Sequence, residues 1–154
     1  MSQEGSFAVH ELTDDDMDLF RKLLAVFGQA FEEPETYTSA QPGTAYLRKL
    51  LGGDQFIGLA AIEDDAVIGG LAAYELQKFE QERSEIYIYD LAVLAQHRRK
   101  GVATALINAL RSIGAARGAY VIFVQADPPD APAVALYTKL GVREDVLHFD
   151  IPVD

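Results

Sequence analysis

The stretch Glu85–Leu110, EIYIYDLAVLAQHRRKGVATALINAL, is the most informative part of this 154-residue chain. An apolar run as far as Val93 predicts a buried strand, a short basic turn follows it, and helical spacing begins at Val102. A strand that leads through such a turn into a helix directs backbone N–H groups and the positive end of the helix dipole to one place. The turn is therefore expected to bind an anion such as a pyrophosphate.

The residues of the turn favour the same interpretation. Arg98, Arg99 and Lys100 add positive charge to a chain whose formal net charge is −11. Gly101 lets the backbone approach a phosphate closely, and Ala103 keeps the first helical turn uncrowded. The alternative is a basic turn at a strand–helix junction that binds no ligand.

Composition restricts the class of protein. The length suits one domain with a proper core, and 49% hydrophobic and 24% charged residues are ordinary for a soluble globular protein. The chain has no cysteine, which excludes disulfides, thiolate metal sites and a cysteine nucleophile. His10, His97 and His148 lie far apart and show no metal-ligand spacing, so no metal is expected.

The acidic charge also bears on partners and location. Nucleic acids and anionic membrane surfaces bind basic faces, so neither is an expected partner. A net charge of −11 attracts a cationic small molecule, although acidic proteins are also common because charge keeps them soluble. Residues 1–12 lack the basic and apolar segments of a signal peptide, and no apolar run reaches membrane-spanning length. A cytoplasmic location is therefore expected.

The predicted elements form a mixed α/β (α+β) domain over residues 1–154. A strand over Ser6–His10 precedes a helix capped by Thr13, whose apolar residues recur as far as Phe31. The polar stretch Glu32–Gly43 is expected to be a loop. The remaining expected elements are a helix over Ala45–Leu51, a hairpin of strands Gln55–Glu63 and Ala66–Leu76, a strand over Glu85–Val93, a helix over Val102–Arg117, a strand over Tyr120–Gln125, a helix from Asp130 to Leu140 and a final strand over Val142–Ile151.

The basic turn resembles the acetyl-CoA motif of the GCN5-related N-acetyltransferases, Gln/Arg-x-x-Gly-x-Gly/Ala after a strand, through Arg98, Gly101 and Ala103. The resemblance implies a mostly antiparallel mixed sheet flanked by helices, whose central strands separate to admit the pantetheine arm of acetyl-CoA. It assigns cofactor binding to the strand end, the turn and the helix start: Leu91, Ala92, Val93, Arg98, Arg99, Lys100, Gly101, Val102, Ala103 and Thr104.

Tyr137 stands in AVALYTKLG, residues 133–141, which resembles the second motif of the same family. In that motif a helix tyrosine next to the cofactor sulfur acts as general acid, and a phenol with an ordinary pKa of about 10 suits the protonation of a thiolate. Asp130 stands where the family often has Asn, and Val142 stands where Phe is usual. The alternative is a tyrosine whose ring only fills the core.

Asp90 is an acid inside the apolar run Ile86–Val93. A carboxylate there costs free energy unless it is paired or functional. It could take a proton from an attacking amine or hold the ammonium form in place; pairing with a cation of the chain is the alternative. Glu85, Tyr87 and Tyr89 alternate on the same strand, so without a bulge they share a face and line the acceptor site or pack against a helix.

Further acids lie where the fold would place acceptor loops, at Glu32, Glu33, Glu35, Glu80, Glu82, Asp127, Asp130 and Asp150. Scattered acids usually form a solvated surface, but together these suit an acceptor with several positive charges. The predicted acceptor site consists of Glu32, Glu33, Glu80, Glu85, Tyr87, Tyr89, Asp127 and Asp150.

Longer runs resemble a narrower family, the gentamicin-type aminoglycoside 3-N-acetyltransferases. They include RSEIYIYDLAV at 83–93, GAYVI at 118–122 and residues 133–141, and the resemblance covers most of the chain from about Val26 onward. It implies direct acetyl transfer from acetyl-CoA to the 3-amino group of the deoxystreptamine ring of a cationic aminoglycoside, with antibiotic resistance and often a homodimer. The alternatives are an acetyltransferase for a polyamine, an amino acid or a protein N-terminus, and a non-catalytic acyl-CoA-binding protein.

Overall fold

The computed structural model describes residues 6–154, which divide into a larger unit that ends at Phe123 and a smaller one over Val124–Asp154. The absence of a signal peptide was inferred partly from residues 1–5, which lie outside the described residues. No helix within residues 6–154 combines the length and the apolar character needed to cross a bilayer.

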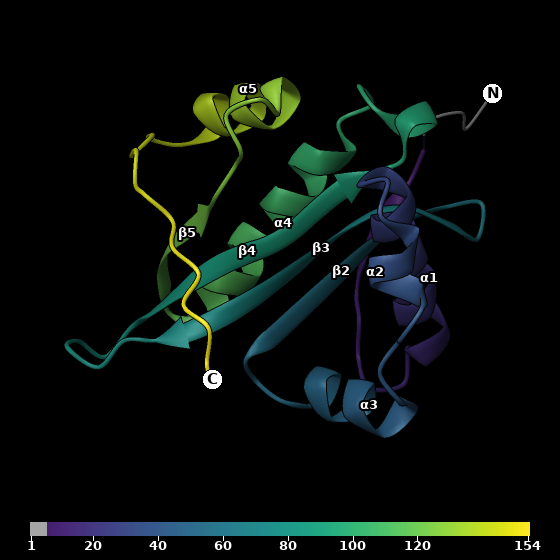
Figure 1. Cartoon of the computed structure of the whole chain (residues 1–154), viewed down its shortest axis with the longest axis horizontal. Helices are drawn as coiled ribbons and strands as arrows, with labels where there is room; N and C mark the ends of the chain where they lie inside the picture. The colour runs from purple at the N-terminus through teal and green to yellow at the C-terminus, as the bar shows by residue number, and fades with distance from the viewer. Residues whose placement is uncertain (1–5) are drawn as a thin grey trace. The chain divides into compact units, whose positions relative to one another are not determined.

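A five-stranded sheet in the order β1-β2-β3-β4-β5 forms the centre of the larger unit (Figure 1). The first four strands pair antiparallel: β1 (Ala8–Glu11), β2 (Phe56–Glu63), β3 (Ala66–Gln77) and β4 (Ser84–Val93). The last strand, β5 (Ala119–Val124), points the same way as β4 in Figure 1, so the sheet is mixed as expected. The predicted hairpin turns at Asp64 and Asp65, whose φ angles of 51° and 63° suit a tight turn between twisted strands.

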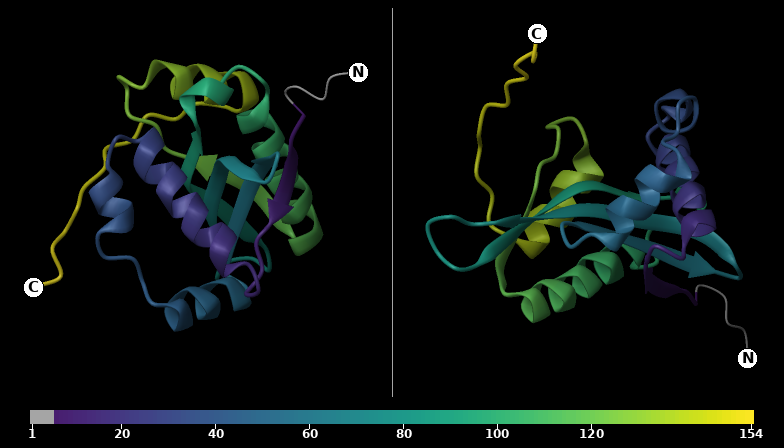
Figure 2. Two further views of the ribbon diagram at one scale, coloured as in Figure 1. Left: turned by 90° about the vertical axis from the view of Figure 1, so that its right-hand side faces the viewer. Right: turned by 90° about the horizontal axis from the view of Figure 1, so that it is seen from below.

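Two amphipathic helices cover opposite faces of the sheet (Figure 2). One face packs against α1 (Met17–Ala30), which buries Phe20, Leu23 and Phe27 at helical spacing. The other face packs against α4 (Val102–Arg117), whose buried residues include Leu106 and Leu110. Because α4 connects two parallel neighbours, it is the crossover that such a pair of strands requires.

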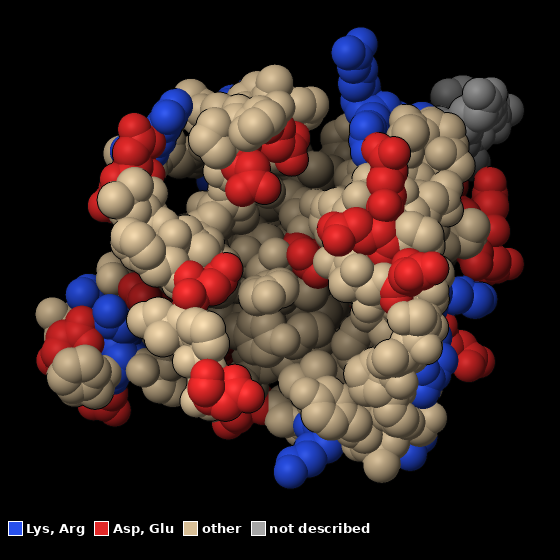
Figure 3. All heavy atoms as spheres, in the orientation of Figure 1, with Lys and Arg blue, Asp and Glu red and all other residues tan. Residues whose placement is uncertain are grey.

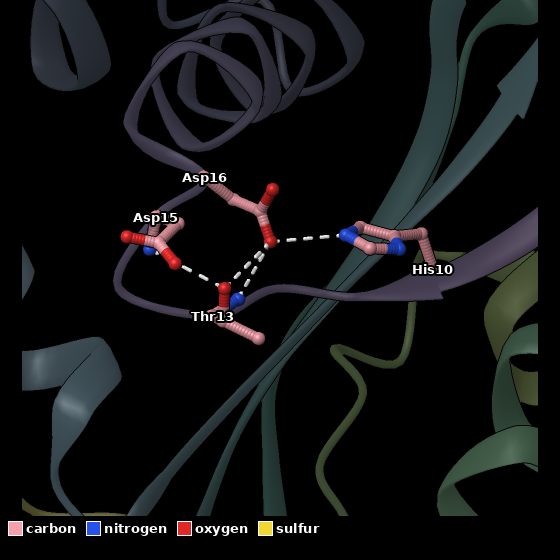
Figure 4. Close-up of polar contacts among 4 residues, drawn as sticks. All are labelled: His10, Thr13, Asp15 and Asp16. Carbon is pink, nitrogen blue, oxygen red and sulfur yellow. Dashed lines mark hydrogen bonds and ion pairs between the residues drawn. The ribbon is translucent and has the colours of Figure 1, made fainter.

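The start of α1 differs from the predicted cap at Thr13. The helix begins at Met17, and the Asp16 carboxylate turns back to accept hydrogen bonds from the Thr13 N–H at 2.7 Å and hydroxyl at 3.2 Å (Figure 4). The same carboxylate lies 2.9 Å from His10 Nε2. Burial opposes ionisation of Asp16, but the bonds from Thr13 and His10 prevail and lower its pKa below the usual value. Thr13 therefore orders the approach to the helix and is not its N-cap residue.

The prediction of a loop over Glu32–Gly43 is wrong in part. A short helix, α2 (Pro34–Thr38), occupies its middle, and α3 (Thr44–Gly52) follows. Pro34 is the first helical residue, where its fixed φ is favourable and its missing N–H costs nothing. The polarity of the stretch hid a helix that the proline could have signalled.

In the smaller unit α5 (Ala131–Leu140) forms where it was predicted. The Asp130 carboxylate accepts the Ala133 N–H at 3.3 Å and caps the helix. The final strand over Val142–Ile151 is not formed, and Leu147, Phe149 and Ile151 are exposed. Alternating apolar residues favour a strand, but a strand is stabilised by a paired neighbour, which the pattern does not supply.

Candidate functional site

The turn between β4 and α4 has the geometry of an anion site. A 3₁₀ turn over Ala95–His97 leads to Arg99 and Gly101, whose φ angles of 64° and 81° lie in the left-handed region. The first main-chain bond of α4 joins the Ala105 N–H to the Gly101 carbonyl at 3.0 Å, and no side chain caps the helix. The N–H groups of residues 102–104 are therefore available to a ligand.

Most of the basic side chains of this turn have no ion-pair partner within the described residues. Arg98 Nε donates to the Val93 carbonyl at 3.1 Å and holds the turn against the end of β4. Arg99 and Lys100 are exposed, and within residues 6–154 neither has an ion-pair partner. Two unpaired cations beside free helical amides fit a phosphate-bearing ligand.

A cavity of about 240 Å³ lies beside this turn. Its lining comes from the end of α1 with the residue after Phe31 and from the turn between β4 and α4 (residues 94–101, the anion turn): Gln29, Ala30, Glu32, Leu94, Ala95 and Arg98. Glu32, which the sequence assigned to the acceptor site, therefore lines the same cavity as Arg98. His97 Nδ1 lies 3.7 Å from Glu63 Oε1, which is beyond hydrogen-bond distance.

A β-bulge in β4 decides where Asp90 points. Ala72 of β3 lies opposite Asp90 but Ala73 lies opposite Ile88, so Tyr89 is an extra residue in the ladder. The predicted alternation of side chains along β4 therefore continues only as far as this bulge. Beyond it every side chain changes face.

The bulge turns Asp90 toward the face that α1 covers. Before it, Ile86 and Ile88 are buried on the α4 side, where a side chain at Gly114 would contact Ile86. After it, Ala92 belongs to the core beneath α1. Asp90 consequently shares the face of Tyr87, which places a carboxylate among aromatic rings.

Asp90 has a neutral partner. The Tyr37 hydroxyl, from α2, donates to Asp90 Oδ2 at 3.0 Å. No Lys, Arg or His among residues 6–154 pairs with this carboxylate, so the alternative of an internal ion pair is wrong for the described residues. Burial raises the pKa of Asp90 above its usual value; the bond from Tyr37 opposes that rise and the charge of Glu33 adds to it.

Aromatic side chains surround the carboxylate. Tyr89 meets Tyr74 and Tyr87 edge-on, with ring centroids 6.0 and 5.9 Å apart, and Tyr87 stacks on Phe123 at 4.8 Å. Burial followed by the charge of Asp90 raises the pKa of Tyr37, which keeps that phenol a hydrogen-bond donor. Aromatic faces around an unneutralised acid are suited to an organic cation.

The predicted acceptor acids are not equivalent. Lys78 Nζ lies 3.3 Å from Glu80 and 3.4 Å from Glu85, and the Tyr120 hydroxyl donates to Glu85 at 3.0 Å. Lys78 therefore neutralises part of the charge that these two acids would offer. Glu33 is exposed and acts on Asp90 through its charge. In Figure 3 acidic side chains spread over the visible face, while basic ones lie mainly at its margins.

The smaller unit carries the remaining predicted site residues. Burial and then the charge of Asp130 raise the pKa of Tyr137 to about 12, so its hydroxyl stays protonated at neutral pH. Asp127 is exposed, and Asp150 lies 2.9 Å from His148 Nε2. Among the described residues no group of His, Asp and Glu is arranged to hold a metal ion.

Sequence reasoning missed Tyr37, because it lies in the stretch predicted to be a loop. Two signals were present: Pro34 marks a helix start, and Phe27 and Phe31 lie one turn apart on the preceding helix. The Tyr37 ring packs against both, with centroids 6.0 and 5.9 Å away. An aromatic residue shortly after such a pair can close the helix–helix contact.

Comparison with known proteins defines the class. Residues 17–142 match the model of the acetyltransferase (GNAT) family, and the chain belongs to this family. The co-substrate of these acetyltransferases is acetyl-CoA. The free amides of residues 102–104 and the unpaired Arg99 and Lys100 have the chemistry that binding of its pyrophosphate requires.

Particular relatives refine the comparison. The crystal structure of the aminoglycoside acetyltransferase HMB0005, from an uncultured soil metagenomic sample, is 64% identical with a TM-score of 0.95, covering 97% of this chain and 99% of that chain. The aminoglycoside acetyltransferase meta-AAC0020, also from an uncultured soil metagenomic sample and in complex with sisomicin, is 28% identical with a TM-score of 0.90, covering 99% and 100%. An N-alpha-acetyltransferase of Saccharolobus solfataricus is 32% identical over 95 residues, 54% of each chain, so this chain spans about half the length of that relative.

Proposed function

We propose that this chain transfers the acetyl group of acetyl-CoA to an aminoglycoside, at the 3-amino group of the deoxystreptamine ring. The observation that carries the proposal is Asp90, a half-buried carboxylate with no cationic partner among the described residues. A buried charge without a counter-charge is costly. A substrate ammonium supplies that counter-charge, and an aminoglycoside carries several.

The comparisons support the acceptor class and the sequence supports the position. HMB0005, an aminoglycoside acetyltransferase, is 64% identical to this chain, and meta-AAC0020 was solved with the aminoglycoside sisomicin. The 3-amino position comes from the runs at 83–93 and 133–141 that resemble the gentamicin-type enzymes. Acetylation of that amine removes one positive charge from the drug and weakens its attraction to RNA phosphates.

In the proposed mechanism the chain first fixes the donor. Amides of residues 99–104, with the charges of Arg99 and Lys100, bind the pyrophosphate. Main-chain groups of Leu91 to Val93 align the pantetheine, and an N–H near Val93 polarises the thioester carbonyl. The strand β5 has 6 residues against 10 in β4, which favours an open edge at the end of β4. When bound, acetyl-CoA supplies an acetyl thioester as the electrophile.

Asp90 and Tyr137 then move the protons. An amine attacks only in its neutral form, so Asp90 accepts its proton, directly or through a water molecule. The raised pKa of Asp90 improves it as a base, provided that the working pH lies above that pKa. Tyr137 donates a proton to the leaving thiolate. The amine displaces the thiolate directly, and no enzyme nucleophile is needed.

The acceptor is held by the acids and rings around Asp90. Glu33, Tyr87 and Tyr89 are the proposed members of this site nearest to Asp90. Glu32, Glu80 and Glu85 add negative charge, which Lys78 neutralises in part at the last two. Asp127 and Asp150 are included on the sequence alone. In this proposal residues 1–154 form one N-acetyltransferase domain that acts in the cytoplasm as a homodimer and confers resistance.

A second acceptor class has a specific observation in its favour. The N-alpha-acetyltransferase of Saccharolobus solfataricus shares 32% identity over 95 residues, so a protein N-terminus is the competing acceptor. Such a substrate presents one ammonium group, whereas an aminoglycoside presents several to the acids around Asp90. The two classes are separated by direct assay.

The deciding experiment is thiol release from acetyl-CoA with gentamicin, spermidine or an N-terminal peptide as acceptor. Turnover with gentamicin alone, and a product whose NMR spectrum shows acetylation at the 3-amino group, is the expected result. Turnover only with the peptide would show that the acceptor is a protein N-terminus. Turnover with none of the three would contradict the proposal that the acceptor is an aminoglycoside. Minimal inhibitory concentrations in cells that express the chain, and the mass in solution by light scattering, test resistance and the dimer.

A further inference from the structure

The helix α2 is held very close to α1. A side chain at Gly28 of α1 would meet the Cα of Pro34 at 3.0 Å and the Cβ of Tyr37 at 3.3 Å, closer than such carbons normally approach. The Glu33 N–H donates to the Gly28 carbonyl at 2.8 Å and fixes the chain where it enters α2. A side chain at residue 28 would therefore push α2 away from α1 by a few tenths of an ångström, so glycine lets the two helices lie this close.

Tyr37 is held through its ring, its main-chain carbonyl and its hydroxyl. Its ring packs against Phe27, which is buried, and Phe31, and its carbonyl accepts the Gln41 side-chain amide at 3.2 Å. Gln41 is itself held by Arg21, whose guanidinium donates to it at 2.7 Å. The hydroxyl at the far end reaches Asp90 Oδ2 at 3.0 Å, across 53 positions of sequence.

We propose that Tyr37 is a positioning residue for acetyl transfer: its hydroxyl holds one oxygen of Asp90 and leaves the other for the substrate amine. The inference rests on the proposed function of Asp90. A hydrogen bond to one oxygen restricts the rotamers of the carboxylate and thereby the direction of its free oxygen. Such fixed placement of a base is a large part of catalysis by orientation.

Among the groups around Asp90, the Tyr37 hydroxyl favours the charged form of the carboxylate through its hydrogen bond, whereas burial and Glu33 oppose that form. The titratable groups that face Asp90 are Tyr37 and Glu33 near α2, Tyr74 on β3, and Tyr87 and Tyr89 on β4. None of them is a cation, and Glu33 repels the carboxylate. The hydrogen bond from Tyr37 favours the charged state, so its loss would raise the pKa of Asp90 further.

The test compares Tyr37→Phe with Tyr46→Phe, a matched loss of a hydroxyl at an exposed tyrosine of α3. In Tyr37→Phe we expect kcat with gentamicin to fall about tenfold, the scale of a bond to a charged group. The acid limb of kcat/KM against pH should move to higher pH, while the Kd for acetyl-CoA stays unchanged. Tyr46→Phe should match the wild type in all three measurements.

The outcomes separate this inference from the proposed function. If Asp90→Asn is inactive and Tyr37→Phe keeps the wild-type kcat and acid limb, Tyr37 only packs and the inference is overturned. If Asp90→Asn keeps full activity, the base assignment itself fails. Should Tyr37→Phe not fold, Gly28→Val displaces α2 with the hydroxyl intact, because even the first carbon of a side chain there lies only 3.0 Å from the Cα of Pro34. A lowered kcat with a shifted acid limb in that variant supports the inference, and unchanged values overturn it.

Discussion

Two acids on neighbouring strands, both withdrawn from solvent, differ in the partners that the fold gives them. Glu75 on β3 is 5% exposed, accepts the Ser84 hydroxyl at 2.6 Å and pairs with Arg117 at 2.8 Å. Asp90 on β4 has one neutral donor, Tyr37, and no cation among the described residues. The charge of Glu75 is neutralised within the chain, whereas that of Asp90 has no counter-charge among the described residues, and we propose that a substrate ammonium supplies it.

The difference follows from position in the sheet. Arg117 is in the last turn of α4, where a cation also favours the helix dipole, and it reaches Glu75 and the Asp54 carbonyl together. Asp90 is turned by the bulge at Tyr89 to the other face, which carries rings and acids. A cation held by the fold would block the same carboxylate as a substrate site.

The largest effect is expected from Asp90→Asn. This change keeps the shape and removes the base, so kcat/KM with gentamicin should fall about 100-fold or more. The Kd for acetyl-CoA should stay the same, since the anion turn is untouched. Stopped assays and calorimetry on the same preparation measure both quantities. Full turnover in this variant would mean that Asp90, like Glu75, has a structural role only.

The opposite result is expected from Glu75→Ala. Removal of this acid leaves the buried Ser84 hydroxyl without its acceptor and Arg117 with only the Asp54 carbonyl and the distant Glu11, so we expect the free energy of unfolding to fall by about 2 kcal/mol. Because Arg117 is partly exposed, the loss is smaller than for a fully buried pair. Urea denaturation measures it, and kcat/KM of the folded enzyme should change less than about threefold. A large loss of kcat with normal stability would contradict the comparison.

Much of the difference between Asp90 and Glu75 could not be predicted from the sequence. Asp90 was recognisable because an acid inside IYIYDLAV violates the apolar pattern, and the anion turn was recognisable from a compact local motif. The bulge at Tyr89 was not, because a register shift depends on the partner strand. Tyr37 was hidden because its partner is 53 positions away and its helix follows a polar, proline-containing stretch. The pattern over Val142–Ile151 predicted a strand because alternation reports propensity and not pairing.

A smaller loss of kcat is expected from Tyr137→Phe. This variant extends the comparison from the two acids to a neutral proton donor. With a pKa of about 12 the phenol remains protonated at neutral pH and can give its proton to a thiolate. We expect kcat to fall about tenfold with an unchanged Kd for acetyl-CoA. Unaltered kinetics would mean that solvent protonates the thiolate.

The smallest expected effect is on the pH dependence of the free energy of unfolding, which tests the surroundings of Asp90 without any substrate. Burial raises the pKa of Asp90, so the folded state retains its proton at a pH where the unfolded chain, with an aspartate pKa of about 3.9, has lost it. The contribution of Asp90 to stability is thus present at low pH and is lost as pH rises from that value through the raised pKa. The amide introduced by Asp90→Asn does not titrate, so the free energy of unfolding of the wild type should decline relative to this variant over the same window. A difference that instead favours the wild type as pH rises would mean that folding lowers the pKa of Asp90, and would contradict the buried, uncompensated setting described for it.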